Sequence, residues 1–361
     1  MTKQQQNPAH LPQLDGLRAL ALAFVFFWHF YKIEALPGKW ATIPYGEIGV
    51  RLFFVLSGFL ITGILLRVRT AGKNNFKEKI HLIRQFYMRR FLRIFPLYYL
   101  VILGALLIFP QVTRGILVWL LTYTTNFLLV LRGEDAAGWF AHFWSLAIEE
   151  QFYLFWPWIM VFAPTEGLLP IILAMVGTGP LYRWYVASHH FSPEAVLLLT
   201  PTTFDALGLG ALLAWLWHHK LYGPKTEQRI FPAVVGLSML GLVFLAVMGR
   251  GVLFDVWFYF FVGLISFCLV GRAANGYPDK LGQLMASNPP TYIGKISYGL
   301  YVYHMFFVPL LIVVFNKVGW WAYIRGLRFL AIGSLASLAV ASLSWFAIER
   351  PINKLKSRFT Y

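Results

Sequence analysis

Cysteine and charged residues are scarce in this sequence of 361 residues. The one cysteine, Cys268, lies inside an apolar run, which excludes a disulfide framework and a thiolate metal site. Charged residues make up 13% of the chain, against roughly 25% in soluble globular proteins. Hydrophobic residues make up 58%, and the mean hydropathy is +0.62. These proportions exclude a water-soluble globular protein and indicate a membrane protein.

Several motifs and segment types are also missing. Neither H-E-x-x-H nor another metal-ligand spacing occurs, and there is no P-loop and no G-x-G-x-x-G, so a metal cofactor and ATP-driven transport lose support. No repeat, low-complexity segment or Pro/Ser-rich linker divides the chain. We therefore expect one membrane domain over residues 1–361, with short cytoplasmic tails at 1–13 and 350–361.

Ten apolar runs predict an all-α polytopic membrane protein with about ten transmembrane helices. The first run contains His29 and is not followed by an A-x-A pattern, so we interpret it as a retained span rather than a signal peptide. The predicted spans are 17–33, 48–66, 92–109, 143–162, 168–186, 204–218, 230–248, 252–271, 296–315 and 327–348.

The distribution of Lys and Arg predicts the orientation of these spans. With ten spans and both termini in the cytoplasm, 21 Lys and Arg lie on the inner side and 6 in the outer loops. Counting the apolar stretch 115–131 as a further span would leave about 15 against 12, so we expect it not to cross. The Lys and Arg residues that give the chain its net charge of +16 lie between apolar runs rather than on one amphipathic face. This placement reflects membrane topology, and no nucleic-acid partner is expected.

The most basic stretch, 67–93, holds nine Lys and Arg and one acid, Glu78. It could be a topology signal that also holds anionic lipid. Alternatively, it could be a cytoplasmic cradle for a polyanion such as a coenzyme phosphate. Arg90 and Arg93 are three residues apart at the start of a span, so they share a helix face and could grip one phosphate.

Two ionisable residues share one face of the first span. Arg18 and His29 are eleven residues apart, which is almost three helical turns and about 16 Å of rise. They could hold the two ends of a long molecule with an anionic head. Otherwise Arg18 extends to the membrane surface and His29 caps a neighbouring carbonyl.

The fourth span places carboxylates at membrane depth, where charge is expensive. Ser145 and Glu149 are four apart on one face, whereas Glu150 points about 100° away. These acids could form a core salt bridge, with Arg18 or Arg183 as partner.

The other interpretation is that Glu149 orients and charges a histidine, as the third member of a catalytic group does. His29 is the first candidate histidine, and His304, within SYGLYVYHM at 297–305, is the second.

Two further polar residues have ordinary structural explanations. Ser57 lacks a G-x-S-x-G elbow, so close helix packing through Ser57 and Gly58 is preferred to a serine nucleophile. Asp205 begins the sixth span, where an acid at a helix N-terminus is common.

Six motifs occur in order along the chain: LDGLRALALAFVFFWHF (14–30), FFVLSGFLIT (53–62), RRFLRIFPLYY (89–99), FWSLAIEEQFYLFWP (143–157), SYGLYVYH (297–304) and IERP (348–351). Together they resemble the membrane acyltransferase 3 family of O-acyltransferases. The resemblance covers nearly the whole chain and implies a ten-helix membrane domain that moves an acyl group, usually acetyl from acetyl-CoA, onto a carbohydrate hydroxyl. Some members carry an SGNH esterase-like domain, and this sequence resembles the form without it.

The resemblance implies roles for individual residues. The family's arginine and histidine of the first span correspond to Arg18 and His29, its R-x-x-R pair to Arg90 and Arg93, and its S-L-x-x-E glutamate to Glu149. On this basis we expect the catalytic residues to be Arg18, His29 and Glu149, with His29 as the general base supported by Glu149. Arg18, Arg90 and Arg93 are expected to bind acyl-CoA. Weaker candidates for substrate contacts are Ser57, Ser145, Tyr298, Asp205 and His304.

The expected setting is the bacterial cytoplasmic (inner) membrane, with acetyl-CoA as cosubstrate, no metal, a carbohydrate acceptor and the lipid bilayer as partners, together with proteins of polysaccharide assembly. Two other function classes would use the same buried charges. A flippase or small-molecule permease would bind and transport its substrate without turning over acetyl-CoA. A structural subunit of a polysaccharide export complex would tolerate replacement of Arg18, His29 and Glu149.

Overall fold

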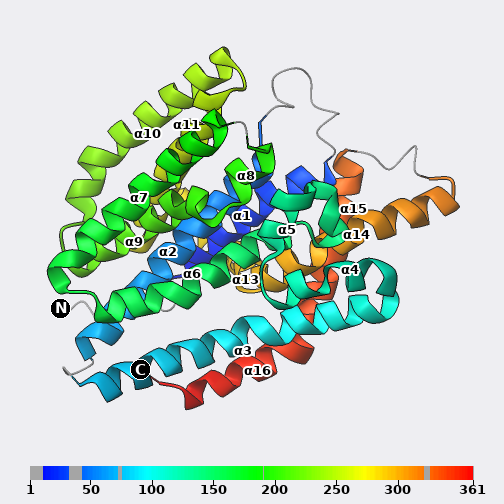
Figure 1. Ribbon diagram of the computed structural model, residues 1–361, viewed down its shortest axis with the longest axis horizontal. Coiled ribbons are helices and arrows are strands. Elements are labelled where there is room, and N and C mark those ends of the chain that lie inside the picture. The colour runs from blue at the N-terminus through cyan, green and yellow to red at the C-terminus, as the bar shows by residue number, and fades with distance from the viewer. Residues whose placement is uncertain (1–10, 32–42, 72–74, 190, 321–325, 361) are drawn as a thin grey trace.

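The computed structural model describes residues 11–31, 43–71, 75–189, 191–320 and 326–360 (Figure 1). Every regular element within these residues is helical, which confirms the predicted all-α class. Short 3-10 and π-helical segments join some of the helices. The α-helices are α1 (Pro12–Phe30), α2 (Tyr45–Ala71), α3 (Phe76–Ile108), α4 (Pro110–Leu121), α5 (Thr125–Arg132), α6 (Phe143–Phe162), α7 (Thr165–Ser188), α8 (Pro193–Leu198), α9 (Phe204–His218), α10 (Pro224–Met248), α11 (Val252–Asn275), α12 (Lys280–Met285), α13 (Asn288–Lys295), α14 (Ser297–Lys317), α15 (Leu327–Ser344) and α16 (Arg350–Lys354).

Six helices in the described part of the chain are long and apolar enough to cross a membrane, so the chain is a polytopic membrane protein. They are α2, α3, α10, α11, α14, and α15 with its continuation toward Arg358. The other four predicted spans form α1, α6, α7 and α9, and α9 has only 15 residues. Residues 1–10 of the predicted tail 1–13, and residues 32–33 of the first predicted span, lie outside the described residues.

The ambiguous stretch 115–131 is not one helix. It is divided between α4 and α5, and Tyr123 at the break has a positive φ of 52°. At 1.5 Å per residue, the 12 residues of α4 and the 8 of α5 reach about 18 Å and 12 Å, well short of the roughly 30 Å hydrocarbon layer. Neither helix alone is long enough to cross.

Helices α2 and α9 pack backbone to backbone in the middle of the molecule. A Cβ atom on Gly58 would lie 2.1 Å from the Leu207 carbonyl oxygen, and one on Gly210 would lie 2.1 Å from the Val55 carbonyl oxygen. Only glycine allows such an approach, which is a common way for membrane helices to associate. The close packing predicted at Gly58 is confirmed.

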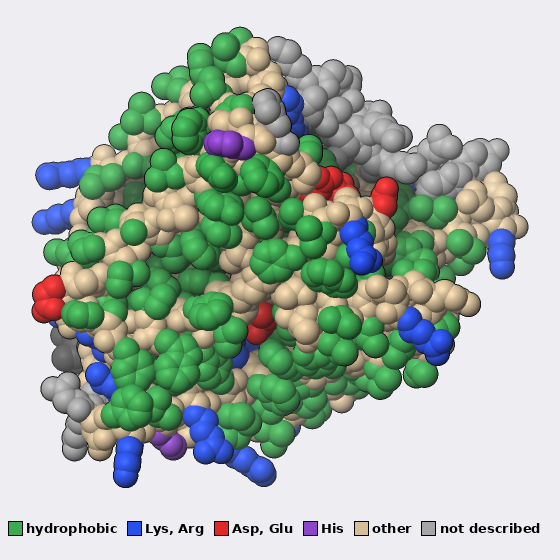
Figure 2. All heavy atoms as spheres, in the orientation of Figure 1, with side chains coloured by type: hydrophobic (Ala, Val, Ile, Leu, Met, Phe, Trp, Pro, Cys, Tyr) green, Lys and Arg blue, Asp and Glu red, His purple; other side chains and the backbone are tan. Residues whose placement is uncertain are grey.

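The outer surface is largely apolar. Figure 2 shows a broad field of hydrophobic side chains on one face, with Lys and Arg side chains concentrated toward the edges of the view. Helix α10 contributes many exposed aliphatic and aromatic side chains, including Leu237, Leu240 and Phe244. A surface of this kind suits a lipid environment and would be unfavourable in water.

Helix α3 and the C-terminal segment lie side by side (Figure 1). The 33 residues of α3 extend about 50 Å, more than a bilayer core requires, and their first half is the basic part of the sequence. The Arg89 guanidinium donates to the backbone carbonyls of Lys356 at 3.2 Å and Phe359 at 2.8 Å. These bonds hold the C-terminal segment against the basic half of α3.

Candidate functional site

A cavity of about 520 Å³ collects most of the residues that the sequence analysis selected. Its walls come from α1, α2, α3, α6, α9 and α14, together with the C-terminal segment. The size is that of a small-molecule binding site. The predicted site residues that line it are Arg18, Ser57, Arg90, Arg93, Ser145, Glu149 and Tyr298.

The cavity wall is strongly basic. Arg18 forms an ion pair with Asp15 on α1, and the Arg90 guanidinium lies 4.1 Å from the centre of the Tyr153 ring, a cation–π contact. Arg93 lines the same wall. Further basic side chains there are Arg67, Arg89, His218 and Lys356, whereas the acids among the described lining residues are Glu149 and Glu150. This balance favours a ligand with several negative charges.

Glu149 belongs to a small polar network on the cavity wall. The Ser57 hydroxyl donates to Glu149 Oε1 at 2.7 Å, and the Tyr153 hydroxyl donates to Glu149 Oε2 at 3.0 Å. Tyr153 is one helical turn after Glu149 on α6, so the two share a face. The contact links the carboxylate through Tyr153 to Arg90.

This network corrects the expected geometry of Glu149. The sequence analysis assigned it to orient His29, but its carboxylate oxygens accept from Ser57 and Tyr153 instead. The alternative of a core salt bridge from the fourth span to Arg18 or Arg183 is also wrong. Arg18 pairs with Asp15, and Arg183 pairs with Asp205.

His29 forms a pair with His304. His304 Nε2 lies 3.1 Å from His29 Nδ1, and the ring centres are 4.9 Å apart. His304 Nδ1 lies 2.7 Å from the backbone carbonyl oxygen of Tyr301. A third histidine, His142, has its ring centre 4.8 Å from that of His304.

The histidine pair lies just beyond the cavity. Tyr301 and Phe53 line the cavity with their rings 6.3 Å apart, and His304 follows Tyr301 by three residues, about 4.5 Å of rise. The Tyr301 hydroxyl contacts Ser145 Oγ at 2.6 Å and donates to the His142 carbonyl at 3.0 Å. Polar contacts therefore connect the end of the cavity to the histidines.

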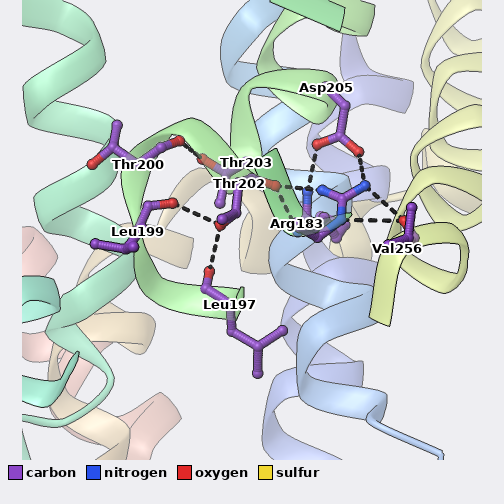
Figure 3. A network of polar contacts seen from close by, with 9 residues as sticks. Arg183, Leu197, Leu199, Thr200, Thr202, Thr203, Asp205 and Val256 are labelled. Atoms are coloured by element: carbon purple, nitrogen blue, oxygen red, sulfur yellow. Dashed lines mark hydrogen bonds and ion pairs between the residues drawn. The ribbon is translucent and has the colours of Figure 1, made fainter. Parts of the chain in front are cut away.

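Asp205 lies outside the cavity, between two buried arginines. Arg51 and Arg183 each bond one of its oxygens at 2.7 Å, and Arg183 also donates to the Val256 carbonyl (Figure 3). Both arginines donate to the Thr202 carbonyl as well. Because its oxygens are already engaged, Asp205 acts as a clamp between α2, α7 and α9, not as a substrate contact.

Several residues of the site were not identified from the sequence. Tyr153 and Tyr301 line the cavity, His142 joins the histidines, and Lys356 brings the C-terminal segment to the cavity wall. The spacings Glu149–Tyr153 and Tyr301–His304 are one helical turn and could have drawn attention to both tyrosines. Lys356 carries no such signal. Among the described residues, no group of three or more His, Cys, Asp and Glu is arranged to hold a metal ion.

Comparison with known proteins finds a family model described as an acyltransferase domain, which matches residues 11–346. "Peptidoglycan O-acetyltransferase OatA" of Listeria monocytogenes is 28% identical over 375 residues, covering 96% of this chain and 56% of the relative. "O-acetyltransferase OatA" of Staphylococcus aureus is 29% identical over 385 residues, covering 96% and 58%. The chain thus spans somewhat more than half the length of these relatives. No solved structure matches the chain.

Proposed function

The chain belongs to this acyltransferase family, and on that premise we propose that it is a membrane O-acyltransferase. The donor is a cytoplasmic acyl-CoA, most simply acetyl-CoA. The acceptor is a sugar hydroxyl of a cell-surface or exported polysaccharide or glycolipid, and the enzyme lies in a bacterial cytoplasmic membrane. The name of the Listeria relative, a peptidoglycan O-acetyltransferase, supports an acceptor of the glycan class.

The cavity is the observation that carries the proposal. Coenzyme A has several phosphate charges at one end of a long flexible arm and the acyl thioester at the other. Arg18, Arg90 and Arg93 line one cavity together, and arginine forks match phosphate oxygens well. Glu149 balances part of this positive charge and keeps the Ser57 hydroxyl and Tyr153 in place. The cavity therefore binds the donor.

The acyl group is transferred at the other end of the donor. Arg18 and His29 are on the same helix, about 16 Å apart along its axis, a distance that the arm of coenzyme A covers. The Tyr301 ring lines the cavity and its centre lies 5.4 Å from that of the His304 ring, so we propose that the Tyr301 side chain moves aside when the thioester arrives.

The chemistry is a direct acyl transfer assisted by a general base. His29 takes the proton of the acceptor hydroxyl, and the oxygen forms a bond to the acyl carbonyl carbon. The carbon–sulfur bond then breaks, and the departing thiolate receives the proton from His29. The acyl group is passed to an acceptor from the outer side, while coenzyme A remains on the inner side.

This route requires a defined orientation in the membrane. We propose ten crossings with both termini in the cytoplasm and residues 115–131 not crossing. The excess of Lys and Arg in the inner loops supports this arrangement. It places the basic half of α3 and Lys356 on the cytoplasmic side, where acyl-CoA is found.

Mass spectrometry of surface glycans tests the proposed function. Glycans are compared between cells that make the protein, cells lacking its gene, and deletion cells given back either wild type or His29→Ala. We expect O-acyl groups to disappear in the deletion, to return with wild type, and not to return with His29→Ala. Glycans with unchanged acylation in the deletion strain would contradict the proposal.

A further inference from the structure

The contacts of His304 indicate where the lone pair of His29 lies. We propose that His304 is a positioning residue that holds His29 in the tautomer with a free lone pair on Nε2. The inference rests on the proposed function only where it treats His29 as the base. The tautomer itself follows from the hydrogen-bond geometry.

The first step concerns the Tyr301 carbonyl. A carbonyl oxygen can only accept a hydrogen bond, so His304 Nδ1, at 2.7 Å from it, must carry the hydrogen. A neutral imidazole has one N–H and one lone pair. His304 Nε2 is therefore the nitrogen with the lone pair, as long as the ring is neutral.

The surroundings of His304 favour the neutral ring. Its side chain is fully buried, at 0% exposure, and stacks on Phe26 with ring centres 5.2 Å apart. Phe30 packs against it edge-on at 6.3 Å. A charged imidazole in this apolar position, next to two other histidines, would be costly.

The second step concerns the hydrogen bond between His304 Nε2 and His29 Nδ1. Because His304 Nε2 accepts, the hydrogen between the two rings must belong to His29 Nδ1, 3.1 Å away. The remaining nitrogen of a neutral His29, Nε2, then has the free lone pair. This is the state that a general base needs before it takes a proton.

His142 does not compete for His304 Nε2. Its own Nε2 lies 3.3 Å from the Val302 carbonyl and therefore carries the hydrogen of that ring. Its Nδ1 is buried and forms no hydrogen bond with any of the described residues, so it is not the donor to His304. The donor to His304 Nε2 is thus His29.

The pair also acts after proton transfer. When His29 Nε2 takes the acceptor proton, the ring becomes an imidazolium whose Nδ1–H still donates to His304 Nε2. That bond then becomes charge-assisted and stronger. His304 keeps its own proton throughout and contacts neither substrate, so it supplies the orienting role that the sequence analysis had assigned to Glu149.

Nitrogen-15 solid-state NMR of histidine-labelled protein in liposomes tests the tautomer directly, without any substrate. The sequence has nine histidines, and the His29 signals are assigned from their loss in His29→Gln. We expect protonated Nδ1 and unprotonated Nε2 in wild type. In His304→Phe, which keeps a ring but offers no acceptor, the Nε2–H form of His29 should increase severalfold.

Two controls separate positioning from packing. His304→Gln restores an oxygen acceptor and should restore the wild-type tautomer. His189→Phe removes an exposed histidine that also bonds a backbone carbonyl, at 2.8 Å, and should change nothing at His29. A His29 signal with Nε2–H in wild type would overturn the proposal. Because this spectrum is recorded on wild-type protein, it tests the tautomer even if His304→Phe does not fold. An unchanged tautomer in folded His304→Phe would overturn it as well.

Turnover provides the second readout. His304→Phe should lower kcat for acyl transfer by about 10²-fold with the KM for acetyl-CoA unchanged, since general base catalysis typically contributes about 10²–10⁴. His304→Gln should recover part of the loss, and equal losses in both variants would mean that His304 only packs. If wild type shows the expected tautomer but transfers no acyl group, the proposed function fails while the positioning by His304 stands.

Discussion

Glu149 accepts one hydrogen bond from Ser57 of α2 and another from Tyr153 of its own helix, α6. Its spacing from Ser145 placed it on a helix face with other polar groups, and it lines the cavity as that face suggested. The spacing could not indicate that Ser57 of α2 lies opposite it, because 92 residues separate them in the chain. Its partners are set by packing between helices, and only the three-dimensional arrangement identifies them.

Glu149→Gln should reduce kcat/KM for acetyl-CoA by about 10-fold or more. The change removes the charge that accepts from Ser57 and Tyr153, and a hydrogen bond to a charged group contributes about 1.5–3 kcal/mol. Glu150→Gln is the matched control, since Glu150 lines the same cavity. Steady-state kinetics on both purified variants should show the larger loss for Glu149→Gln, and a larger loss for Glu150→Gln would contradict the assignment.

The Arg90→Ala, Arg93→Ala double variant should weaken acetyl-CoA binding by at least about 10-fold, because each change removes a charge-assisted phosphate contact. The remaining binding should depend less on salt. Titration calorimetry with acetyl-CoA at two salt concentrations measures both effects. Arg250→Ala, which alters an arginine outside the cavity wall, is the control. Donor affinity that is the same in wild type and the double variant would mean that the phosphates bind elsewhere.

Among the individual residues, those that share a helix face were the most predictable. Arg90 and Arg93 on α3, and Ser145 and Glu149 on α6, line the cavity as their spacing suggested. The contact between His29 and His304 was not predictable, because it joins α1 to α14 across 275 residues.

At the level of helices, long apolar runs were sufficient to locate the main elements. Within the described residues, each of the ten predicted spans falls mainly on a helix, and the boundaries differ mainly where amphipathic ends extend a helix, as at the start of α3. The sequence did not predict that the C-terminal segment forms part of the cavity wall. Lys356 reaches that wall because Arg89 bonds the backbone there, an interaction that follows no periodic pattern.

Gly58→Ala tests the packing of α2 against α9. The added methyl group would meet the Leu207 carbonyl oxygen at 2.1 Å, so the helices must separate, and overpacking of this kind typically costs about 1–3 kcal/mol. Gly104→Ala on α3 is the control, because nothing lies within 4 Å of a Cβ atom there. Thermal unfolding in detergent should show a lower Tm for Gly58→Ala alone. Equal Tm values for the two variants would argue against this tight contact.

The whole molecule combines an apolar outer surface with a basic cavity that reaches toward the pair formed by His29 and His304. Composition alone predicted the membrane environment, because a chain with so few charged and so many apolar residues cannot bury all of its apolar surface away from water. The cavity could not be predicted in this way. Its wall comes from seven segments spread from Arg18 to Lys356, and their convergence depends on the packing of the entire bundle.

A cysteine-accessibility scan tests the orientation of the molecule. After Cys268→Ser, single cysteines at Lys225 and Lys356 should resist an impermeant thiol reagent added to intact cells, while a cysteine at Ser192 should react. Permeabilised cells provide the control, because all three positions should then react. Labelling of Lys225→Cys and Lys356→Cys from outside would mean that residues 115–131 cross the membrane and that donor and acceptor enter by different routes.

The most direct test of the central claim is transfer of labelled acetyl by the purified protein in liposomes. Acetyl-CoA labelled in its acetyl group is supplied on the side of the C-terminus, and glycan extracted from cells lacking the gene is supplied on the other side. We predict that alkali-labile label appears on the glycan, with free coenzyme A left on the donor side, and that His29→Ala lowers the rate by about 10²-fold or more. Glycan that stays unlabelled with wild type, or a His29→Ala variant that transfers acetyl at the wild-type rate, would contradict the account.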